Sequence, residues 1–127
     1  MANPSKQKGT RAETRVVRYL ESCGFTARRQ ALAGSDDHGD IEAYAPGFED
    51  CKMIIEIKTG KQTANPSRSQ IIEWCRQAKV EAENEGTEDA VLIVVRYNRR
   101  LEDADVWIPY DRSRVHWYLG DWVNHFA

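Results

Sequence analysis

Asp40, Glu56 and Lys58 are the residue types that metal-assisted cutting of a phosphodiester requires. A divalent cation polarises the phosphate and generates hydroxide near neutral pH. Magnesium prefers hard oxygen ligands, commonly one or two carboxylates together with water and substrate oxygens. A lysine beside the attacking water neutralises charge that develops in the transition state. The three side chains therefore match such a centre, provided that the fold brings them together.

The spacing of these residues predicts that their side chains lie close together in the fold. Successive side chains of a strand point to opposite faces, so Glu56 and Lys58, within a predicted strand at 52–58, emerge on the same face. Asp40 heads the preceding predicted strand, and pairing of the two strands as a hairpin would place it near the end of the later one. Glu13, at the edge of the buried face of a predicted first helix, could reach the same point.

Each of these pieces is common by itself. A Glu-x-Lys pair on a strand is usually a solvent-facing ion pair, and Glu13 on a basic helix is usually a surface residue that pairs one turn away. The combination of all four residues at these intervals, followed by a helix and an apolar strand, is more specific than any part of it.

Hydrophobic periodicity and turn residues predict the elements that would position them. A first helix is predicted from Gly9 to Cys23, with Gly24 as its left-handed stop, and a second from Ser67 to Gly86, with Gln70 in capping-box position. Strands are predicted at 25–32, 40–45, 52–58, 90–97 and 105–109, and the aromatic tail from Ser113 forms a helix or a last strand. This order predicts an α/β sandwich around a mixed sheet of about five strands.

The bulk composition is that of an ordinary globular protein, with 127 residues, 41% hydrophobic and 30% charged. We expect a flexible basic arm over 1–8 and a single domain over 9–127, without a secretory signal or a membrane span. The sequence has three cysteines, Cys23, Cys51 and Cys75. Their odd number and wide spacing argue against a disulfide framework and a zinc site, and favour reduced thiols in an intracellular protein.

Charge is unevenly distributed along the chain although the net charge is only −2. Residues 1–29 carry seven basic and two acidic side chains, whereas residues 81–105 carry three basic and eight acidic ones. The basic end could meet a phosphate backbone while the acidic part keeps the protein soluble. Solvated surfaces at both ends explain the same pattern.

Three short motifs make the sequence resemble the PD-(D/E)xK nuclease superfamily, and within it the small Holliday junction resolvases of archaeal type and their phage relatives. The motifs are Lys8-Gly9-Thr10-Arg11-Ala12-Glu13, the glycine-serine loop from Ala33 to Ile41 that contains Asp40, and Glu56-Ile57-Lys58. Gly39 stands where the superfamily motif has a proline, and the loop carries Asp36, Asp37 and His38 in addition.

The resemblance implies a restriction-endonuclease-like core and a definite set of roles. Asp40 and Glu56 would hold Mg²⁺, with Mn²⁺ as a substitute, and Glu13 would bind the metal or orient its water shell. Lys58 would position or activate water, and Ser35 would sit next to the scissile phosphate. Members of this family are homodimers that nick two opposed strands of a four-way junction, so branched double-stranded DNA is the implied partner.

Basic side chains near these motifs are candidates for phosphate contacts, which fix register without reading sequence. They are Lys6, Lys8, Arg11, Arg15, Lys61 and Arg68. Among the aromatic residues, Trp74 is expected in the core. The tail aromatics Trp117, Tyr118, Trp122 and Phe126 are expected to cover one side of the sheet or, alternatively, to form a dimer interface.

Two other functions remain open at this stage. The same core serves restriction enzymes and repair or end-processing nucleases, although 127 residues leave little space for recognition loops. A DNA-binding module could also keep the fold without catalysis. Its signature would be a lost metal ligand, and all four candidate residues are present here.

Overall fold

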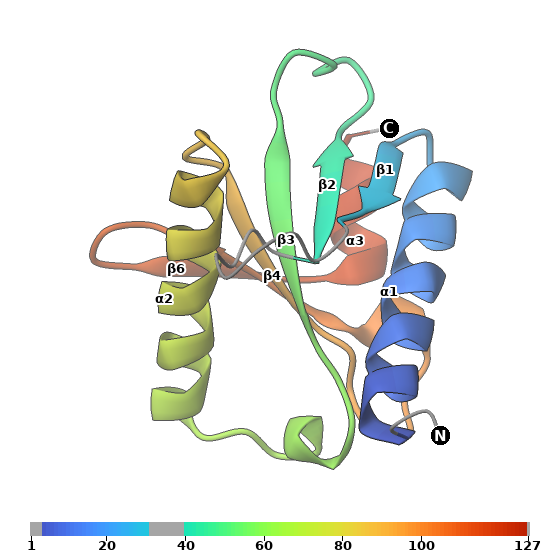
Figure 1. Ribbon diagram of the computed structural model, residues 1–127, viewed down its shortest axis with the longest axis vertical. Coiled ribbons are helices and arrows are strands. Elements are labelled where there is room, and N and C mark those ends of the chain that lie inside the picture. The colour runs from blue at the N-terminus through green and yellow to red at the C-terminus, as the bar shows by residue number, and fades with distance from the viewer. Residues whose placement is uncertain (1–3, 31–39, 127) are drawn as a thin grey trace.

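The computed structural model describes residues 4–30 and 40–126, with side chains from Arg11 onwards. Three α-helices, six strands and two short 3-10 helices follow one another in these ranges (Figure 1). In chain order they are α1 (Pro4–Ser22), β1 (Thr26–Arg29), β2 (Ile41–Tyr44), β3 (Met53–Lys58), η1 (Lys61–Thr63), α2 (Arg68–Asn84), β4 (Ala90–Val94), η2 (Leu101–Asp103), β5 (Asp105–Pro109), β6 (Arg114–Tyr118) and α3 (Leu119–His125).

The strands form one open mixed sheet in the order β1-β2-β3-β4-β5-β6. Only β3 and β4 run parallel, and α2 connects them, as a parallel pair requires a crossover. All other neighbours are antiparallel. The register sets Ile41 opposite Ile55, and it sets Lys58 opposite Val94 and Val94 opposite Asp105. The carboxyl end of β3 thus lies beside the carboxyl end of β4.

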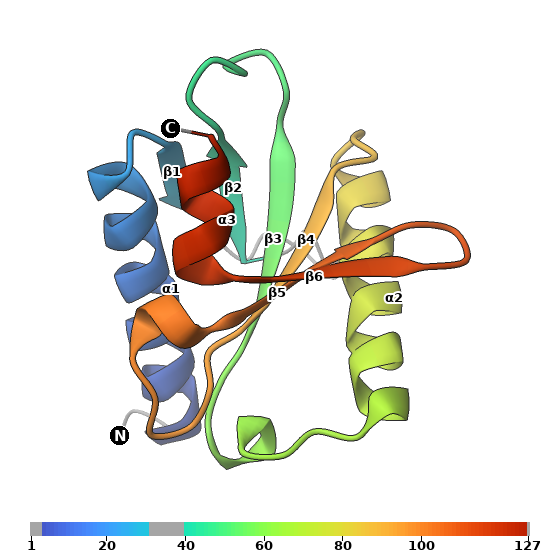
Figure 2. The same cartoon turned by 180° about the vertical axis from the view of Figure 1, so that it is seen from behind.

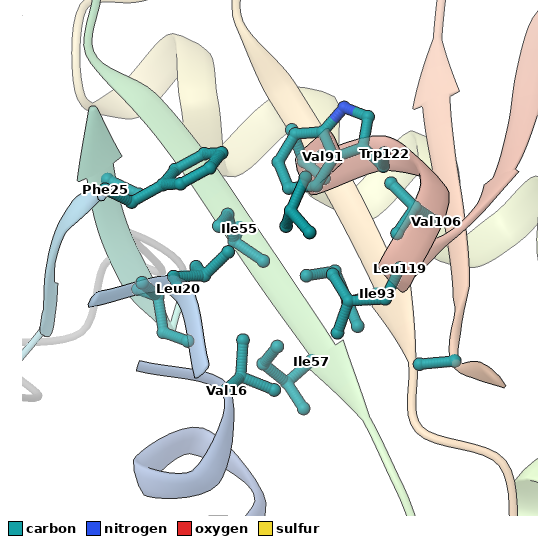
Figure 3. Close-up of a cluster of buried hydrophobic side chains, with 14 of the residues drawn as sticks. Val16, Leu20, Phe25, Ile55, Ile57, Val91, Ile93, Val106, Leu119 and Trp122 are labelled. Atoms are coloured by element: carbon teal, nitrogen blue, oxygen red, sulfur yellow. The ribbon is translucent and has the colours of Figure 1, made fainter. Parts of the chain in front are cut away.

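Helices cover both faces of the sheet, with α1 and α3 on one face and α2 on the other (Figures 1 and 2). The larger core lies on the α1 and α3 face, where side chains of both helices pack on the central strands (Figure 3). Residues of α2 pack on β3 and β4 from the opposite side, among them Trp74 against Leu92 and Val94. The five residues of β4 are all buried, as expected for a central strand covered on both faces.

Local signals place several element ends where the sequence predicts them. The backbone N–H of Gln70 donates to Ser67 Oγ at 3.1 Å, which caps the first turn of α2. Gly24 follows α1 with φ +90°, a conformation that only glycine adopts without strain. The prediction that Trp74 belongs to the core is confirmed.

Three predicted elements differ from the structure. The first helix begins at Pro4 and not near Gly9, so residues 4–8 of the expected arm are helical; proline suits the first turn of a helix. The sheet has six strands because the aromatic tail forms both β6 and α3. The strand predicted at 90–97 ends at Val94, before the chain turns at Asn98, where φ is +57°.

All three cysteines are free, and Cys75 lies on the buried face of α2. Among the described residues, no helix is both long enough and apolar enough to cross a membrane.

Candidate active site

The candidate site lies where β3 continues past the start of β2 (Figure 1). Asp40 directly precedes β2, and its backbone N–H donates to the carbonyl of Ile55 at 3.1 Å. Its Oδ2 accepts the backbone N–H of Ile57 at 2.8 Å, so the side chain satisfies a strand donor that β2 leaves without a partner strand. Asp40 is therefore fixed to the edge of β3.

Glu56 and Lys58 project from the α2 face of β3 beside Asp40, as the alternation along the strand predicts. Glu56 is 6% exposed, and its carboxyl lies close enough to that of Asp40 for each to shift the pKa of the other. Lys58 Nζ lies 3.5 Å from Glu56 Oε1, and its side chain is also largely covered. The hairpin pairing expected from the sequence does bring the three side chains to one end of the sheet.

Glu13 reaches the same point from α1, which packs on the other face of the sheet. Its carboxyl lies close enough to that of Asp40 for each to influence the pKa of the other. The guanidinium of Arg29, at the end of β1, donates from Nε to Glu13 Oε2 at 2.8 Å. Because β3 extends beyond β2 here, acids that start from opposite faces of the sheet meet around Asp40.

A fourth acid extends this group on the α2 side. Glu81 has no solvent exposure, and its proximity raises the pKa of Glu56. Neighbouring carboxyls thus influence one another's pKa from Glu13 through Asp40 and Glu56 to Glu81. Among the described residues, Arg29 pairs with Glu13 and Lys58 pairs with Glu56.

Burial and mutual repulsion change the protonation of these acids. Desolvation, with the charge of Glu56 as the next cause, raises the pKa of Asp40 to about 7. Desolvation, followed by contact with Glu81, raises the pKa of Glu56 to about 8 although Lys58 opposes this shift. Burial also raises the pKa of Glu13 against the opposing effect of Arg29. Asp40 and Glu56 therefore retain much of their protonation near neutral pH.

The donor chemistry of this group fits a divalent hard cation. Among residues 11–30 and 40–126, no three His, Cys, Asp or Glu side chains are already arranged as a cation-binding group. Magnesium needs only one or two protein carboxylates, since water and phosphate oxygens complete its shell. Asp40 and Glu56 supply two adjacent carboxyls whose raised pKa values a bound cation would reverse.

No family model and no curated protein sequence matches the chain. Among solved structures, Hjc from Archaeoglobus fulgidus, a Holliday junction resolvase of an archaeal hyperthermophile, matches with a TM-score of 0.52. The match covers 87% of this chain and 86% of that one, at 19% sequence identity. The chain has a resolvase-like fold. The predicted fold class, a restriction-endonuclease-like core with a mixed sheet flanked by helices, is thereby confirmed.

Within the resolvase-like fold, the predicted DNA contacts are spread over separate surfaces. Arg11 and Arg15 are exposed on α1, two positions to either side of Glu13, so helical spacing turns both away from that side chain. Lys61 and Arg68 are exposed and follow the carboxyl end of β3.

Several predicted residues lie outside the described part of the chain. Ser35 and the neighbouring Asp36, Asp37 and His38 fall in the undescribed segment 31–39, and the side chains of Lys6 and Lys8 precede the first described one. Their roles stay predictions.

Two residues of the site were missed by the sequence reasoning. Arg29 was counted only as part of the basic end, yet alternation along β1 puts it on the face of Ala27, toward α1. Glu81 follows Trp74 by seven residues and Ala78 by three, so it lies on the buried stripe of α2. A carboxylate on a buried helical stripe was the signal that could have revealed it.

Proposed function

We propose that this chain is a metal-dependent, structure-selective endodeoxyribonuclease that resolves four-way (Holliday) or otherwise branched DNA by paired hydrolytic nicks. The observation that carries the proposal is the meeting of Glu13, Asp40, Glu56 and Lys58 at one end of the sheet in a resolvase-like fold. Hjc, which shares that fold, is a Holliday junction resolvase.

In this proposal Asp40 and Glu56 hold Mg²⁺, for which Mn²⁺ can substitute. When bound, the cation polarises the phosphate and lowers the pKa of the attacking water. Asp40 has one oxygen fixed by the N–H of Ile57, so its orientation is set before the cation arrives. Glu13, held by Arg29, supplies a further ligand or orients water around the metal.

Lys58 has a separate role in the proposed chemistry. Its ammonium lies at the edge of the acidic group, 3.5 Å from Glu56, where it can donate to the attacking water. It also neutralises negative charge that develops on the phosphate in the transition state. Ser35 on the loop before Asp40 is proposed to contact the scissile phosphate.

Positive side chains on both sides of the acidic group would hold the phosphate backbone of the DNA. Lys61 and Arg68 are exposed beyond the end of β3 and suit the strand that is cut. Arg11 and Arg15, with Lys6 and Lys8 on the same helix, suit a more distant arm of a branched substrate. Contacts of this kind read the shape of the DNA and not its sequence.

Paired nicks on opposed strands require two centres related by a twofold axis, so we propose a homodimer. An apolar groove of about 580 Å³ runs along the α3 side of the sheet and is partly lined by exposed Phe48, Tyr110 and Val115. Exposed apolar surface of this kind marks protein interfaces. Trp122, in contrast, is buried against Phe25 and Phe126, so it belongs to the core of one chain.

A labelled four-way junction incubated with Mg²⁺ tests the activity, with the linear duplex of the same arms as control. We expect nicks at symmetric positions on two opposed strands, and no nicks with EDTA. Equal cutting of junction and duplex would exclude junction selectivity and leave a nuclease for other DNA. Binding without cutting, in wild type and Glu56→Ala alike and with either Mg²⁺ or Mn²⁺, would indicate a non-catalytic module.

Sedimentation velocity tests the proposed dimer. Phe48→Asp and Val115→Asp place charge in the groove, and we expect both to shift the wild-type dimer to monomer. Val80→Asp is the matched control, since Val80 is a similarly exposed apolar residue on α2. A wild-type protein that sediments as a monomer at micromolar concentration would contradict the dimer.

A further inference from the structure

A small pocket opens beside the ends of β4 and β6, apart from the groove on the α3 side of the sheet. It has a volume of about 320 Å³ and is lined by Arg96, Arg99, Asp103 and Tyr118. Two of these four residues are cationic, one is acidic and the fourth carries a phenolic hydroxyl. Guanidinium groups match the geometry of phosphate oxygens, and a hydroxyl adds a further hydrogen-bond donor. The lining residues therefore have the donor chemistry of a phosphate site.

The turn after β4 brings the two arginines of this pocket together. The backbone N–H of Arg99 donates to the carbonyl of Arg96 at 3.2 Å, which closes a four-residue turn. Within the turn Asn98 has φ +57°, a conformation that asparagine adopts more readily than most residues. The first and fourth residues of such a turn have Cα atoms less than about 7 Å apart. Both arginines are thus anchored at one corner of the pocket.

Arg96 is oriented by a buried partner. Its Nη1 donates to Oδ2 of Asp105 at 3.0 Å, and Asp105 is 7% exposed. This bond uses one of the five N–H groups of the guanidinium, and the Arg96 side chain stays 35% exposed. Because Arg96 lines the pocket, its other N–H groups are available to an anion there. The amide oxygen of an asparagine could accept the same bond, so this orientation does not depend on the charge of Asp105.

The charge of the pocket favours an anion although Asp103 lines it. Arg100 Nε lies 3.5 Å from Asp103 Oδ2 and 3.5 Å from Glu102 Oε2, so these two acids have a cation of their own. Among the described residues, no carboxylate pairs with Arg99, which is exposed. The segment 96–103 holds three arginines and two acids and has a net charge of +1.

The pocket shares a face of the sheet with the candidate active site but lies well away from it. The register places Lys58, Val94, Asp105 and Tyr118 in one row across β3 to β6. Neighbouring strands are about 4.8 Å apart, so three such steps put Tyr118 roughly 14 Å from Lys58 along the row. Trp74 of α2 packs on Val94 between them. A phosphate in the pocket is therefore a different one from the phosphate that is cut.

We infer that Arg96, Arg99 and Tyr118 form a second phosphate site, which binds a backbone phosphate of the DNA away from the point of cutting. This inference rests on the proposed function, which supplies DNA as the ligand. The two guanidinium groups bind the phosphate oxygens, the hydroxyl of Tyr118 donates to one of them, and Asp103 lowers the affinity by repulsion. A contact of this kind holds the DNA in position without reading its sequence.

Fluorescence anisotropy of a labelled four-way junction in EDTA, at several salt concentrations, tests the site without cleavage. We expect Arg99→Ala to reduce the slope of log Kd against log salt by about one, since one cation–phosphate contact is lost. Tyr118→Phe removes only a hydroxyl, so the slope should stay the same while binding weakens about two- to tenfold. Asp103→Asn should tighten binding, because it removes the acid of the pocket.

Arg112→Ala is the matched control for these variants. Arg112 is an exposed arginine in the turn between β5 and β6, at the other end of β6 from Tyr118, and it does not line this pocket. Its Kd and slope should equal those of wild type. Thermal unfolding of each variant checks that the fold is intact.

An Arg99→Ala slope equal to that of wild type, or an Asp103→Asn variant that binds no more tightly, would overturn the phosphate site. An equal loss of slope in Arg112→Ala would also overturn it, because any surface arginine would then have the same effect. Unchanged binding by Tyr118→Phe would contradict the role given to the hydroxyl. Cleavage with Mg²⁺ is scored separately: wild type that shows the expected slopes but cuts no DNA would overturn the proposed nuclease and leave the phosphate site standing.

Discussion

Glu42 and Glu56 are glutamates of neighbouring strands on the same face of the sheet, and both are buried, with 8% and 6% of their surface exposed. The carboxyl of Glu42 pairs with Arg28 and lies 4.0 Å from Lys52 Nζ, while the hydroxyl of Tyr44 contacts it at 3.4 Å. The carboxyl of Glu56 lies between two other acids, with Lys58 at 3.5 Å. Residue type and burial are the same, and only the neighbours differ.

The difference separates a structural acid from a functional one. Glu42 already has its cations, and these tie β1 and the start of β3 to β2. Glu56 lies beside Asp40 and Glu81 as well as Lys58, and burial among these groups raises its pKa to about 8. Burial of an acid is therefore informative about function only together with the charge of what surrounds it.

The largest expected effect comes from removing the charge of each glutamate in turn. Glu56→Gln should lower junction cleavage by about 10²-fold or more, since it removes a proposed metal ligand. It should also stabilise the metal-free protein by about 1–3 kcal/mol at pH 8, because a buried, repelled acid is lost.

The matched change Glu42→Gln should do the reverse. It leaves Arg28 without its carboxylate and Lys52 with Glu85 as its partner, so we expect a loss of about 1–2 kcal/mol in unfolding free energy and little change in cleavage. Urea unfolding and single-turnover cleavage of the junction measure both variants. Parallel effects of the two substitutions would remove the distinction between the two acids.

The second prediction concerns pH. Asp40 and Glu56 have pKa values of about 7 and about 8 in the folded protein, whereas the carboxyls of aspartate and glutamate in an unfolded chain lose their protons near pH 3.8 and 4.5. Between these limits the folded state binds more protons than the unfolded state, so the metal-free protein loses stability as pH rises. We expect a loss on the order of 1–4 kcal/mol between pH 5 and 8, reduced by Mg²⁺.

Urea unfolding in EDTA at several pH values measures this loss. Glu56→Gln should flatten the profile, whereas Glu42→Gln should keep its slope. A wild-type profile that is flat, or that rises with pH, would show that the paired acids of the site do not carry the raised pKa values.

The third prediction uses a buried acid on β5, two strands from Lys58 and on the same face of the sheet. Asp105 is 7% exposed and accepts from Arg96 at 3.0 Å, with His116 Nε2 at 2.7 Å from its other oxygen. It resembles Glu42 in having basic partners. Asp105→Asn should therefore lower the unfolding free energy by about 1–3 kcal/mol and leave cleavage per folded molecule within about twofold. A large loss of cleavage at unchanged stability would assign Asp105 to the site.

The smallest effect is expected at the exposed cations. Lys61→Ala should weaken junction binding about equally for all sequences and reduce the slope of log Kd against log salt by about one. Arg76→Ala is the control, because Arg76 is exposed on α2 and paired with Glu73. Fluorescence anisotropy at several salt concentrations measures both, and equal slopes for Lys61→Ala and wild type would count against a phosphate contact.

Much of this fold and part of the site could be predicted from short stretches of sequence. The alternation in β3 placed Glu56 and Lys58 on one face, and the five residues Asp105–Pro109 were predicted with their observed bounds. Ser67 and Gly24 marked helix ends because capping and positive φ depend on neighbouring residues alone. The start of α1 and the division of the tail into β6 and α3 were not readable, since propensities near chain ends are weak.

By itself, the sequence determined the residues of the candidate centre and the strand that carries two of them, because the side-chain direction of a strand is a local property of its backbone. Only the tertiary structure decided that Arg29 holds Glu13, 16 residues away, and that Glu81 lies against Glu56, on an element beyond the next loop. Contacts between elements depend on how helices pack on the sheet, and no local pattern contains that information. The same packing made Glu42 a structural acid and Glu56 a candidate metal ligand.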